Sequence, residues 1–315
     1  MRRAVTALLG IAALGAAGAA PTPAEAGFSG KNGRIYFESN LHREGLQTDI
    51  YSMTPRGTKM RRVRALPDDQ NEPAVSPDGS RLSFWMWDEG CCPAVWQMNR
   101  RGGALSELAD STVSASPAYG AGGERIAYVD TTGIGPGLVF TGIFTVPADG
   151  GGSPSPLIAD DGQRVRSPSF SADGSRVVYE QDDGTYEQPN WNIHVADANG
   201  TNRRRVTDWP GPELSPDIHP NGRRIVFAGK RGAASPGRRI EIYDVRIDGD
   251  RVRRLTRNGL ADSDPAFSPD GKRIVWTRKL GTNRDIFKMR ANGSNHHPLT
   301  RERRLVLAPD WATRR

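Results

Sequence analysis

The sequence predicts an all-β protein, a six-bladed β-propeller built from four-stranded antiparallel blades. Three observations predict this fold: one phrase recurs along the chain, its copies are spaced like propeller blades, and they complete a ring only when both chain ends contribute. The phrase is Pro, two residues, Ser, a Pro-Asp-Gly-like turn, and then Arg before an apolar run. Its copies begin at Pro73, Pro117, Pro168, Pro216, Pro265 and Pro309.

The spacing of the copies gives the blade size and the blade number. Successive copies begin between 44 and 51 residues apart, which is the period of a four-stranded blade. Complete repeats run from Pro73 to Ala308, the stretch 33–64 lacks a first strand, and the stretch from Pro309 lacks the other three. We therefore expect these two end pieces to join as a sixth, composite blade that closes the ring and leaves only short outer edges.

Each repeat should supply four strands joined by turns. In the copy at 76–79, Ser-Pro-Asp-Gly, proline presets the first turn position and glycine can adopt the left-handed conformation that ends the turn. The next segment, such as Phe84-Trp85, is rich in aromatic and β-branched residues and favours a buried second strand. A third strand such as 285–287, a second glycine turn and a polar outer strand complete the unit, and charge on that outer strand opposes edge-to-edge aggregation.

The N-terminus has the features of a secretory signal peptide. Arg2 and Arg3 precede an apolar run at 4–20, and Ala24-Glu25-Ala26 gives a small-x-small cleavage pattern. The run is at the short limit for a membrane span. We therefore expect a signal peptide at 1–26, a propeller at 27–315, no transmembrane helix after cleavage, and a secreted or periplasmic location.

The chain is basic, with a formal net charge of +7. A basic domain can meet nucleic acid, anionic lipid or an acidic polymer. Because a secreted protein rarely meets nucleic acid and the arginines are spread along the chain, a solvated surface is the simpler interpretation. The expected partner is an envelope or extracellular protein or peptide, or an anionic polysaccharide, with no nucleic acid, and the expected state is a monomer.

The repeated phrase resembles the propeller repeat of the TolB family. The resemblance rests on Pro-x-x-Ser-Pro-Asp-Gly-x-Arg-Ile-x-Phe followed by Asp-Ile-Tyr and Leu-Thr, and it covers 33–312. It implies the fold, but the same repeat occurs in peptidase propellers and polysaccharide lyases, so it implies no single activity. TolB proteins also carry an α/β domain before the propeller. Here only 27–32 separate the expected cleavage site from the first strand, so roles of that domain are not carried over.

Topology assigns the loops to two faces. In an up-and-down blade the first-to-second and third-to-fourth turns share one face, and both are short and contain glycine. The second-to-third loops and the blade-to-blade loops share the other face and vary widely, and because variable loops on a rigid scaffold usually carry binding, we assign function there. Within the blades these loops are 40–47, 88–93, 131–140, 182–190, 231–238 and 280–283.

The residues directly before the repeated proline should ring the mouth of the central channel on the variable face. Nearby interblade loops add further carboxylates, such as those of Asp208, Glu213 and Asp262, so the mouth should be polar to acidic. Such a mouth would suit a basic peptide, a partner loop or Ca²⁺, which takes oxygen ligands. Asp and Ser are also favoured in ordinary turns, and for any single residue that interpretation is the stronger one. The predicted ring is Glu72, Ser116, Ser167, Ser215, Asp264 and Ala308.

Two adjacent cysteines, Cys91 and Cys92, lie in one loop of the variable face. Their Cα atoms would be about 3.8 Å apart, shorter than the usual disulfide span. A vicinal disulfide, free thiols and a crosslink between chains all stay open.

No catalytic residue or metal ligand is predicted. The sequence contains neither a Gly-x-Ser-x-Gly elbow, nor a phosphate-binding Gly-Lys-Ser/Thr loop, nor a dinucleotide fingerprint after a strand, and its five histidines are scattered over different strand positions. We therefore expect an exported, non-catalytic binding or scaffold propeller with no cofactor beyond Ca²⁺ at the mouth. The alternative, which the resemblance implies, is a metal-dependent carbohydrate-active enzyme with a lyase-like propeller.

Overall fold

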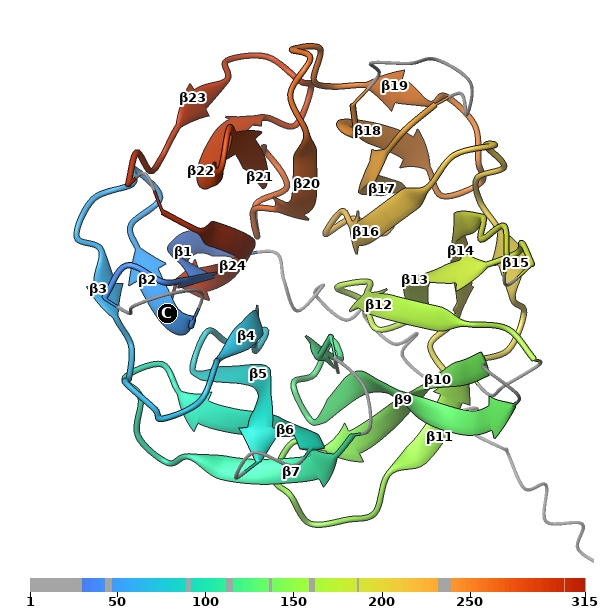
Figure 1. Ribbon diagram of the computed structural model, residues 1–315, viewed down its shortest axis with the longest axis horizontal. Helices are drawn as coiled ribbons and strands as arrows, with labels where there is room; N and C mark the ends of the chain where they lie inside the picture. Colours follow the sequence, from blue (N-terminus) through green and yellow to red (C-terminus); the bar gives the residue numbers. More distant parts are fainter. Residues whose placement is uncertain are drawn as a thin grey trace, which may run out of the picture.

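A computed structural model describes residues 30–42, 47–88, 92–111, 116–135, 138–158, 162–185, 187–231, 239–302 and 304–314, with only the backbone at 88, 92, 132–135 and 138–140. The expected signal peptide lies outside these residues. The described strands form six four-stranded antiparallel sheets around a central axis, which confirms the predicted six-bladed propeller (Figure 1). No helix in the described part of the chain is long and apolar enough to cross a membrane.

Blade 1 joins the two chain ends, as the sequence predicts. Its innermost strand is the last one of the chain, and that strand pairs with β1 in a register that places Trp311 opposite Ile35 and Asp310 opposite Tyr36. Val306 and Trp311 are 0% and 5% exposed, so burial of apolar side chains holds this seam together. From inside to outside the strands are β24 (Val306–Arg314), β1 (Lys31–Ser39), β2 (Asp49–Met53) and β3 (Arg61–Arg62).

The other five blades are each continuous in sequence. Blade 2 contains, from inside to outside, β4 (Asn71–Val75), β5 (Arg81–Asp88), β6 (Cys92–Asn99) and β7 (Ser106–Asp110). Blade 3 contains β8 (Ala118–Tyr119), β9 (Arg125–Gly135), β10 (Leu138–Pro147) and β11 (Ser155–Ile158). Blade 4 contains β12 (Val165–Phe170), β13 (Arg176–Asp182), β14 (Trp191–Asp197) and β15 (Arg204–Arg205). Blade 5 contains β16 (Glu213–Ile218), β17 (Arg224–Gly229), β18 (Glu241–Arg246) and β19 (Arg253–Arg254), and blade 6 contains β20 (Asp262–Phe267), β21 (Arg273–Leu280), β22 (Asn283–Arg290) and β23 (His297–Pro298).

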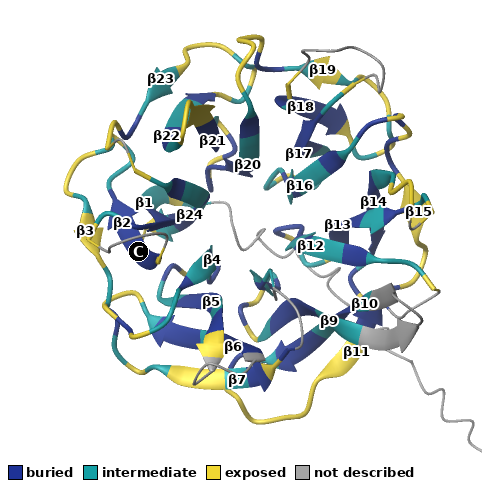
Figure 2. Ribbon diagram, viewed as in Figure 1, coloured by how far each residue is buried: buried dark blue, intermediate teal, exposed yellow. Residues whose placement is uncertain are grey.

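The hydrophobic core consists of layers between neighbouring blades. Successive strand residues point to opposite faces of a sheet, so Tyr36 packs toward blade 2 while Phe37 packs toward blade 6. Figure 2 shows the result: the middle strands are buried, whereas the outer strands and the turns are exposed. Since every blade contributes to two layers, the disc is held together all the way around.

The recurring Ser-Pro-Asp-Gly phrase builds the turn between the first and second strands. Ser76 Oγ accepts the backbone N–H of Arg81 at 2.9 Å and donates to Asp78 Oδ1 at 2.7 Å. Gly79 has a φ of +68°, which glycine adopts without strain, and its N–H reaches Ser76 O at 2.8 Å. The phrase is therefore a structural device, and it defines the face of the disc that we call the short-turn face.

The prediction of a variable loop at 131–140 is wrong. The stretch 131–140 does not form an open loop, because β9 and β10 continue through it as a long hairpin paired up to Gly135 and Leu138. The stretch contains Thr, Ile and Val residues that favour extended strands, and this local propensity extends the hairpin beyond the other blades.

Candidate binding site in the central channel

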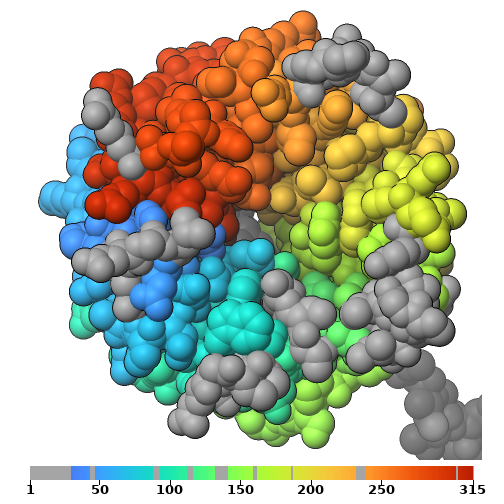
Figure 3. Space-filling model, viewed as in Figure 1, coloured from blue at the N-terminus to red at the C-terminus, as the bar shows by residue number. Residues whose placement is uncertain are grey.

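A cavity of about 430 Å³ lies on the axis of the disc, where the inner strands of the six blades converge. Figure 3 shows the corresponding opening at the centre of the space-filling surface. The structure brings together every residue of the predicted ring in the lining of this cavity: Glu72, Ser116, Ser167, Ser215, Asp264 and Ala308.

A repeated backbone distortion points the ring residues at the channel. All six have φ between +39° and +53°, a region that residues with side chains rarely adopt and that the following proline does not favour. At this point the inner strand slips in register against its neighbour, as between Asn71 and Ala74 or between Leu214 and Asp217. Such bulges redirect side chains and are common beside functional sites. The distortion thus places one side chain per blade at the mouth.

The sequence analysis missed two glutamates that bind the backbone of ring residues, and one of them, Glu38, also lines the cavity. Glu38 Oε2 accepts the backbone N–H of Glu72 at 2.8 Å, and Glu180 Oε1 accepts that of Ser215 at 2.7 Å. Both occupy the same position of the second strand, opposite the residue before the ring residue. Each one joins its own blade to the next. An alignment of the six repeats reveals them, since the other four repeats carry Trp, Val, Ala or Thr at this position.

A second pair of carboxylates lies one residue beyond the repeated proline. Asp310 Oδ2 accepts the backbone N–H of Val75 at 2.7 Å, and Asp217 Oδ2 accepts that of Phe267 at 2.7 Å. Both line the cavity and connect neighbouring blades. The other repeats carry Ala or Ser here, so the same alignment would have indicated these two positions.

Burial raises the pKa values of the channel carboxyls. Burial, with the charges of Glu72 and Asp264 as smaller contributions, raises the pKa of Glu38 to about 8. Burial and the neighbouring Asp310 raise the pKa of Asp217 to about 7. Burial also raises the pKa values of Glu72 and Asp310. Glu72, Asp217 and Asp310 are only partly exposed, and all three line the cavity. The channel therefore holds acids that are poorly hydrated and lie near one another.

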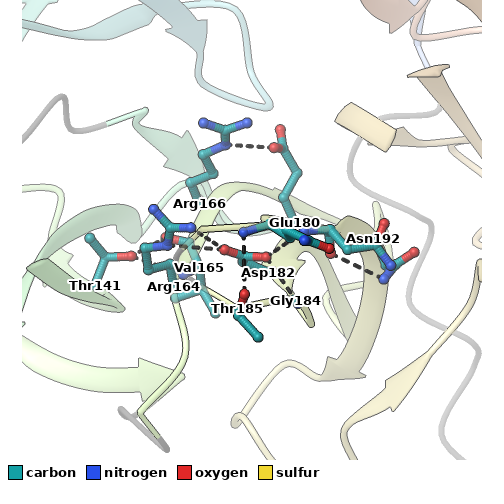
Figure 4. Close-up of polar contacts among 11 residues, drawn as sticks. Thr141, Arg164, Val165, Arg166, Glu180, Asp182, Gly184, Thr185 and Asn192 are labelled. Atoms are coloured by element: carbon teal, nitrogen blue, oxygen red, sulfur yellow. Dashed lines mark hydrogen bonds and ion pairs between the residues drawn. The ribbon is translucent and has the colours of Figure 1, made fainter. Parts of the chain in front are cut away.

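Arginines neutralise only one sector of the mouth. Arg166 Nε donates to Glu180 Oε2 at 2.6 Å (Figure 4). The guanidinium of Arg166 also lies 3.8 Å from the centroid of the Trp191 ring. Arg164 pairs with Asp182 beside it. In the described part of the chain no ion pair involves Glu38, Glu72 or Asp264, although the charge of Arg284, which also lines the cavity, opposes the rise in the pKa of Glu38.

Two carboxylates expected near the mouth lie elsewhere. Asp262 forms a buried two-point ion pair with Arg278, at 2.7 Å and 2.9 Å. Glu213 accepts a hydrogen bond from Thr207 Oγ1 at 2.5 Å, and burial raises its pKa to about 8. Neither residue lines the cavity. The expectation failed because these positions begin the inner strands, where the side chains point between the blades.

The described residues provide no ready metal site. No group of three or more His, Cys, Asp or Glu side chains among them is arranged to hold a metal ion. Ca²⁺ also takes carbonyl and water oxygens, so the Ca²⁺ expected at the mouth stays an untested prediction. Cys91 lies outside the described residues and only the backbone of Cys92 is described, so the vicinal disulfide also stays a prediction.

Comparison with known proteins places the propeller in a family. A family model described as the TolB beta propeller domain matches residues 125–315, more than half of the chain. This chain belongs to the TolB β-propeller family. An uncharacterized protein of Agrobacterium fabrum, Atu1656, is 25% identical over 244 residues, covering 77% of this chain and 76% of the relative.

Two further TolB-family members show how far the similarity extends. The Tol-Pal system protein TolB of Anaeromyxobacter dehalogenans is 29% identical over 121 residues, 38% of this chain but only 26% of that protein. The crystal structure of TolB from Acinetobacter baumannii has a TM-score of 0.75 at 19% identity and covers 90% of this chain and 67% of that one. The structural likeness shows the shared fold, while the activity of a whole TolB protein is not transferred by it.

Proposed function

We propose that this TolB-family propeller is an exported, non-catalytic binding module that holds a basic segment of a protein or peptide in the mouth of its channel. The observation that carries the proposal is the set of crowded, poorly hydrated carboxyls that line an accessible cavity, with Glu38, Glu72 and Asp264 at its upper end. A cationic side chain or chain terminus that enters the cavity favours the ionised forms of Glu38 and Glu72, which burial otherwise disfavours.

The size of the cavity suits such a ligand. A volume of about 430 Å³ falls within the range of small-molecule pockets, so it can enclose one or two long side chains. The polar ring residues Ser116 and Ser215 add hydroxyl groups that already bind carboxylates, with Ser116 Oγ donating to Glu72 Oε2 at 2.7 Å. These groups can exchange partners with an incoming donor.

A purely structural role does not require the charge on these acids. Glu38 and Asp310 accept backbone N–H groups of the next blade, and the neutral amide oxygen of Gln or Asn can accept the same hydrogen bonds. Burying an acid instead of an amide carries an energetic cost. Binding of a cationic group would account for carboxyl groups at these positions, whereas the contacts between blades alone would not.

Export is the second part of the proposal, and it is supported by the signal-like N-terminus and by the relation to TolB. The expected outcome is a mature protein that begins at Gly27 and is recovered outside the cytoplasm. Mass spectrometry of the protein from fractionated cells tests this, and an uncleaved chain that stays in the cytoplasm would contradict it.

The binding proposal is tested with labelled peptides of equal length and opposite charge. Fluorescence anisotropy should show that Lys- and Arg-rich peptides bind the wild-type protein and that acidic ones do not. The double variant Glu72→Gln/Asp264→Asn should weaken this binding by about tenfold or more, because close charge pairs dominate such contacts.

The matched control is Glu124→Gln/Asp149→Asn, which removes the same charge from two exposed residues of the short-turn face. It should change the affinity less than about twofold, because exposed distant charges are screened by salt. Equal losses in the two double variants, or binding of the acidic peptides, would contradict a site at the mouth.

A further inference from the structure

The short-turn face carries a concentration of positive charge that the proposed function does not use. The turns of blades 6, 1 and 2, which are neighbours in the ring, all present exposed basic side chains on this face. We call this set the cationic arc: Lys272 and Arg290 of blade 6, Arg56, Lys59 and Arg61 of blade 1, and Arg100 of blade 2.

Contacts between the blades make the arc continuous. Lys288 Nζ of blade 6 donates to the carbonyl oxygen of Pro55, in the turn that carries Arg56. On the other side, Arg64 Nη1 of blade 1 donates to Gly102 O at 2.9 Å, in the turn that carries Arg100. The three sets of turns therefore form one surface.

The like charges of this surface lie close enough to affect one another. Burial, together with Arg273 and Arg56, lowers the pKa of Lys288. Burial and Arg61 lower the pKa of Arg34, which donates to Lys59 O at 2.6 Å. Crowded cations of this kind favour binding of an anionic group.

The acids of this sector are already engaged within their own turns. Asp270 accepts hydrogen bonds from Ser268 Oγ at 2.6 Å and from the Lys272 N–H at 3.0 Å. Asp78 binds Ser76 and Ser80 in the same way. Within the described part of the chain no member of the arc forms an ion pair, although the charge of Lys272 contributes to the lowered pKa of Asp270 in the same turn.

Blade 3 interrupts the ring of positive charge. Its turns on this face expose Glu124 and Asp149, and its Arg125 is half-buried and donates to Ala198 O at 2.8 Å. On the other side of the arc, blade 5 exposes Arg223, Arg246 and Arg251 together with Asp248 and Asp250, so its turns are of mixed charge. The arc is therefore flanked by exposed acids on both sides, and its extent over three blades fits a chain-like ligand better than a single small anion.

We propose that the cationic arc binds a polyanionic polysaccharide whose repeated acidic groups contact the turns of blades 6, 1 and 2 in succession. A flat lipid surface fits less well, because the exposed large apolar side chains of the described residues lie toward the opposite face, Trp87 and Leu280 near the ends of β5 and β21 and Leu260 in an interblade loop. This leaves no apolar anchor within the arc for insertion into a bilayer. The site uses different residues from the channel and lies on the other side of the disc.

The test measures binding of the full mature chain to polygalacturonate and dextran sulfate fragments of increasing length, with neutral dextran as the reference. Affinity should rise with fragment length and fall steeply with salt, as expected for contacts with a polyanion. The triple variant Arg56→Glu/Arg61→Glu/Arg100→Glu should weaken binding by about tenfold or more.

A matched triple variant separates a local site from the effect of net charge. Arg257→Glu/Lys279→Glu/Arg301→Glu changes the charge equally, on exposed residues of the opposite face, and should change affinity less than about threefold. Equal losses in both triples, no binding of either polysaccharide, or capture by anionic lipid vesicles alone would each overturn the proposal. Since peptide capture at the mouth is measured separately, failure of one site leaves the result for the other intact.

Discussion

The channel and the short-turn face use the same residue types in opposite ways. In the channel, burial raises the pKa values of Asp217 and Asp310. On the short-turn face the pKa values of Asp173 and Asp270 are lowered, because hydrogen bonds from Ser and backbone N–H groups outweigh the effect of partial burial. The position of an Asp relative to the repeated proline therefore decides the direction of its pKa shift. In the turn after the proline the ionised form is stabilised by hydrogen bonds, and in the channel it is destabilised by burial.

The net charge of the chain hides this contrast. A value of +7 describes the whole sequence, while the channel is lined by carboxyls and the turns of blades 6, 1 and 2 present cations. The spread of arginines along the sequence suggested a uniform solvated surface. In the structure exposed arginines lie on both faces: Arg257, Arg301 and Arg304 lie on interblade loops of the variable face, while the turns of blades 6, 1 and 2 carry others on the short-turn face.

The largest loss of stability is expected where β24 pairs with β1 and closes the ring, because this contact supports both the channel and the short-turn face. Trp311 of β24 is 5% exposed and packs among residues of blades 1 and 6. Trp311→Ala should destabilise the fold by about 3–5 kcal/mol through the cavity it leaves. Urea denaturation measures this, with Trp87→Ala at an exposed position as the control. A loss confined to blade 1 in hydrogen exchange would contradict a disc that is held together around its whole ring.

A smaller effect, with a distinctive pH dependence, is expected from Glu38. Its pKa is raised from 4.5 to about 8, so the fold favours the protonated form. The stability that this provides is complete below pH 4.5 and is lost as the pH rises through about 8. Glu38→Gln keeps an acceptor for the Glu72 N–H and should therefore be stabilising at pH 9, by on the order of 2 kcal/mol, and nearly neutral at pH 4.

Denaturation of the wild type and Glu38→Gln across this pH range measures the difference between the two proteins. Equal stability differences at pH 4 and pH 9 would mean that the Glu38 carboxyl titrates normally, and the contrast between the channel and the turns would then be lost.

For the acids of the turns, the free energy of unfolding should depend on pH in the opposite direction and by a smaller amount. The lowered pKa of Asp270 means that its ionised form stabilises the fold above its ordinary pKa of 3.8, and that this stability is lost as the pH falls. Asp270→Ala should cost about 1–2 kcal/mol at pH 7, since it removes hydrogen bonds to a charged group, and much less at pH 2.5. A variant that is destabilised equally at both pH values would refute the capping role.

The sequence predicted the disc and the ring of the channel well because both follow from repetition. The proline phrase recurs at each inner strand, so its spacing gives the blades, and the residue before it has the same left-handed backbone conformation in every blade. The composite blade followed from counting complete strands.

The sequence alone did not predict the channel acids or the cationic arc, because both depend on how the blades pack together. Glu38 and Glu180 lie on second strands, and their approach to the ring depends on how one blade packs on the next. The arc combines turns of blades 6, 1 and 2 that are far apart in sequence, since blade 6 meets blade 1 only through closure of the ring. Glu213 and Asp262 were misplaced for a similar reason, because proximity in sequence to the ring did not determine the direction of their side chains.

The most direct test of the channel site is a count of the protons released when it binds a basic peptide at pH 7. Glu38 and Asp217 have pKa values near 8 and 7, so a cation that enters the channel should ionise them and release protons. Isothermal titration calorimetry in two buffers of different ionisation enthalpy measures this number. Our account predicts a clear release that is reduced in Glu38→Gln, and binding without any release would contradict it.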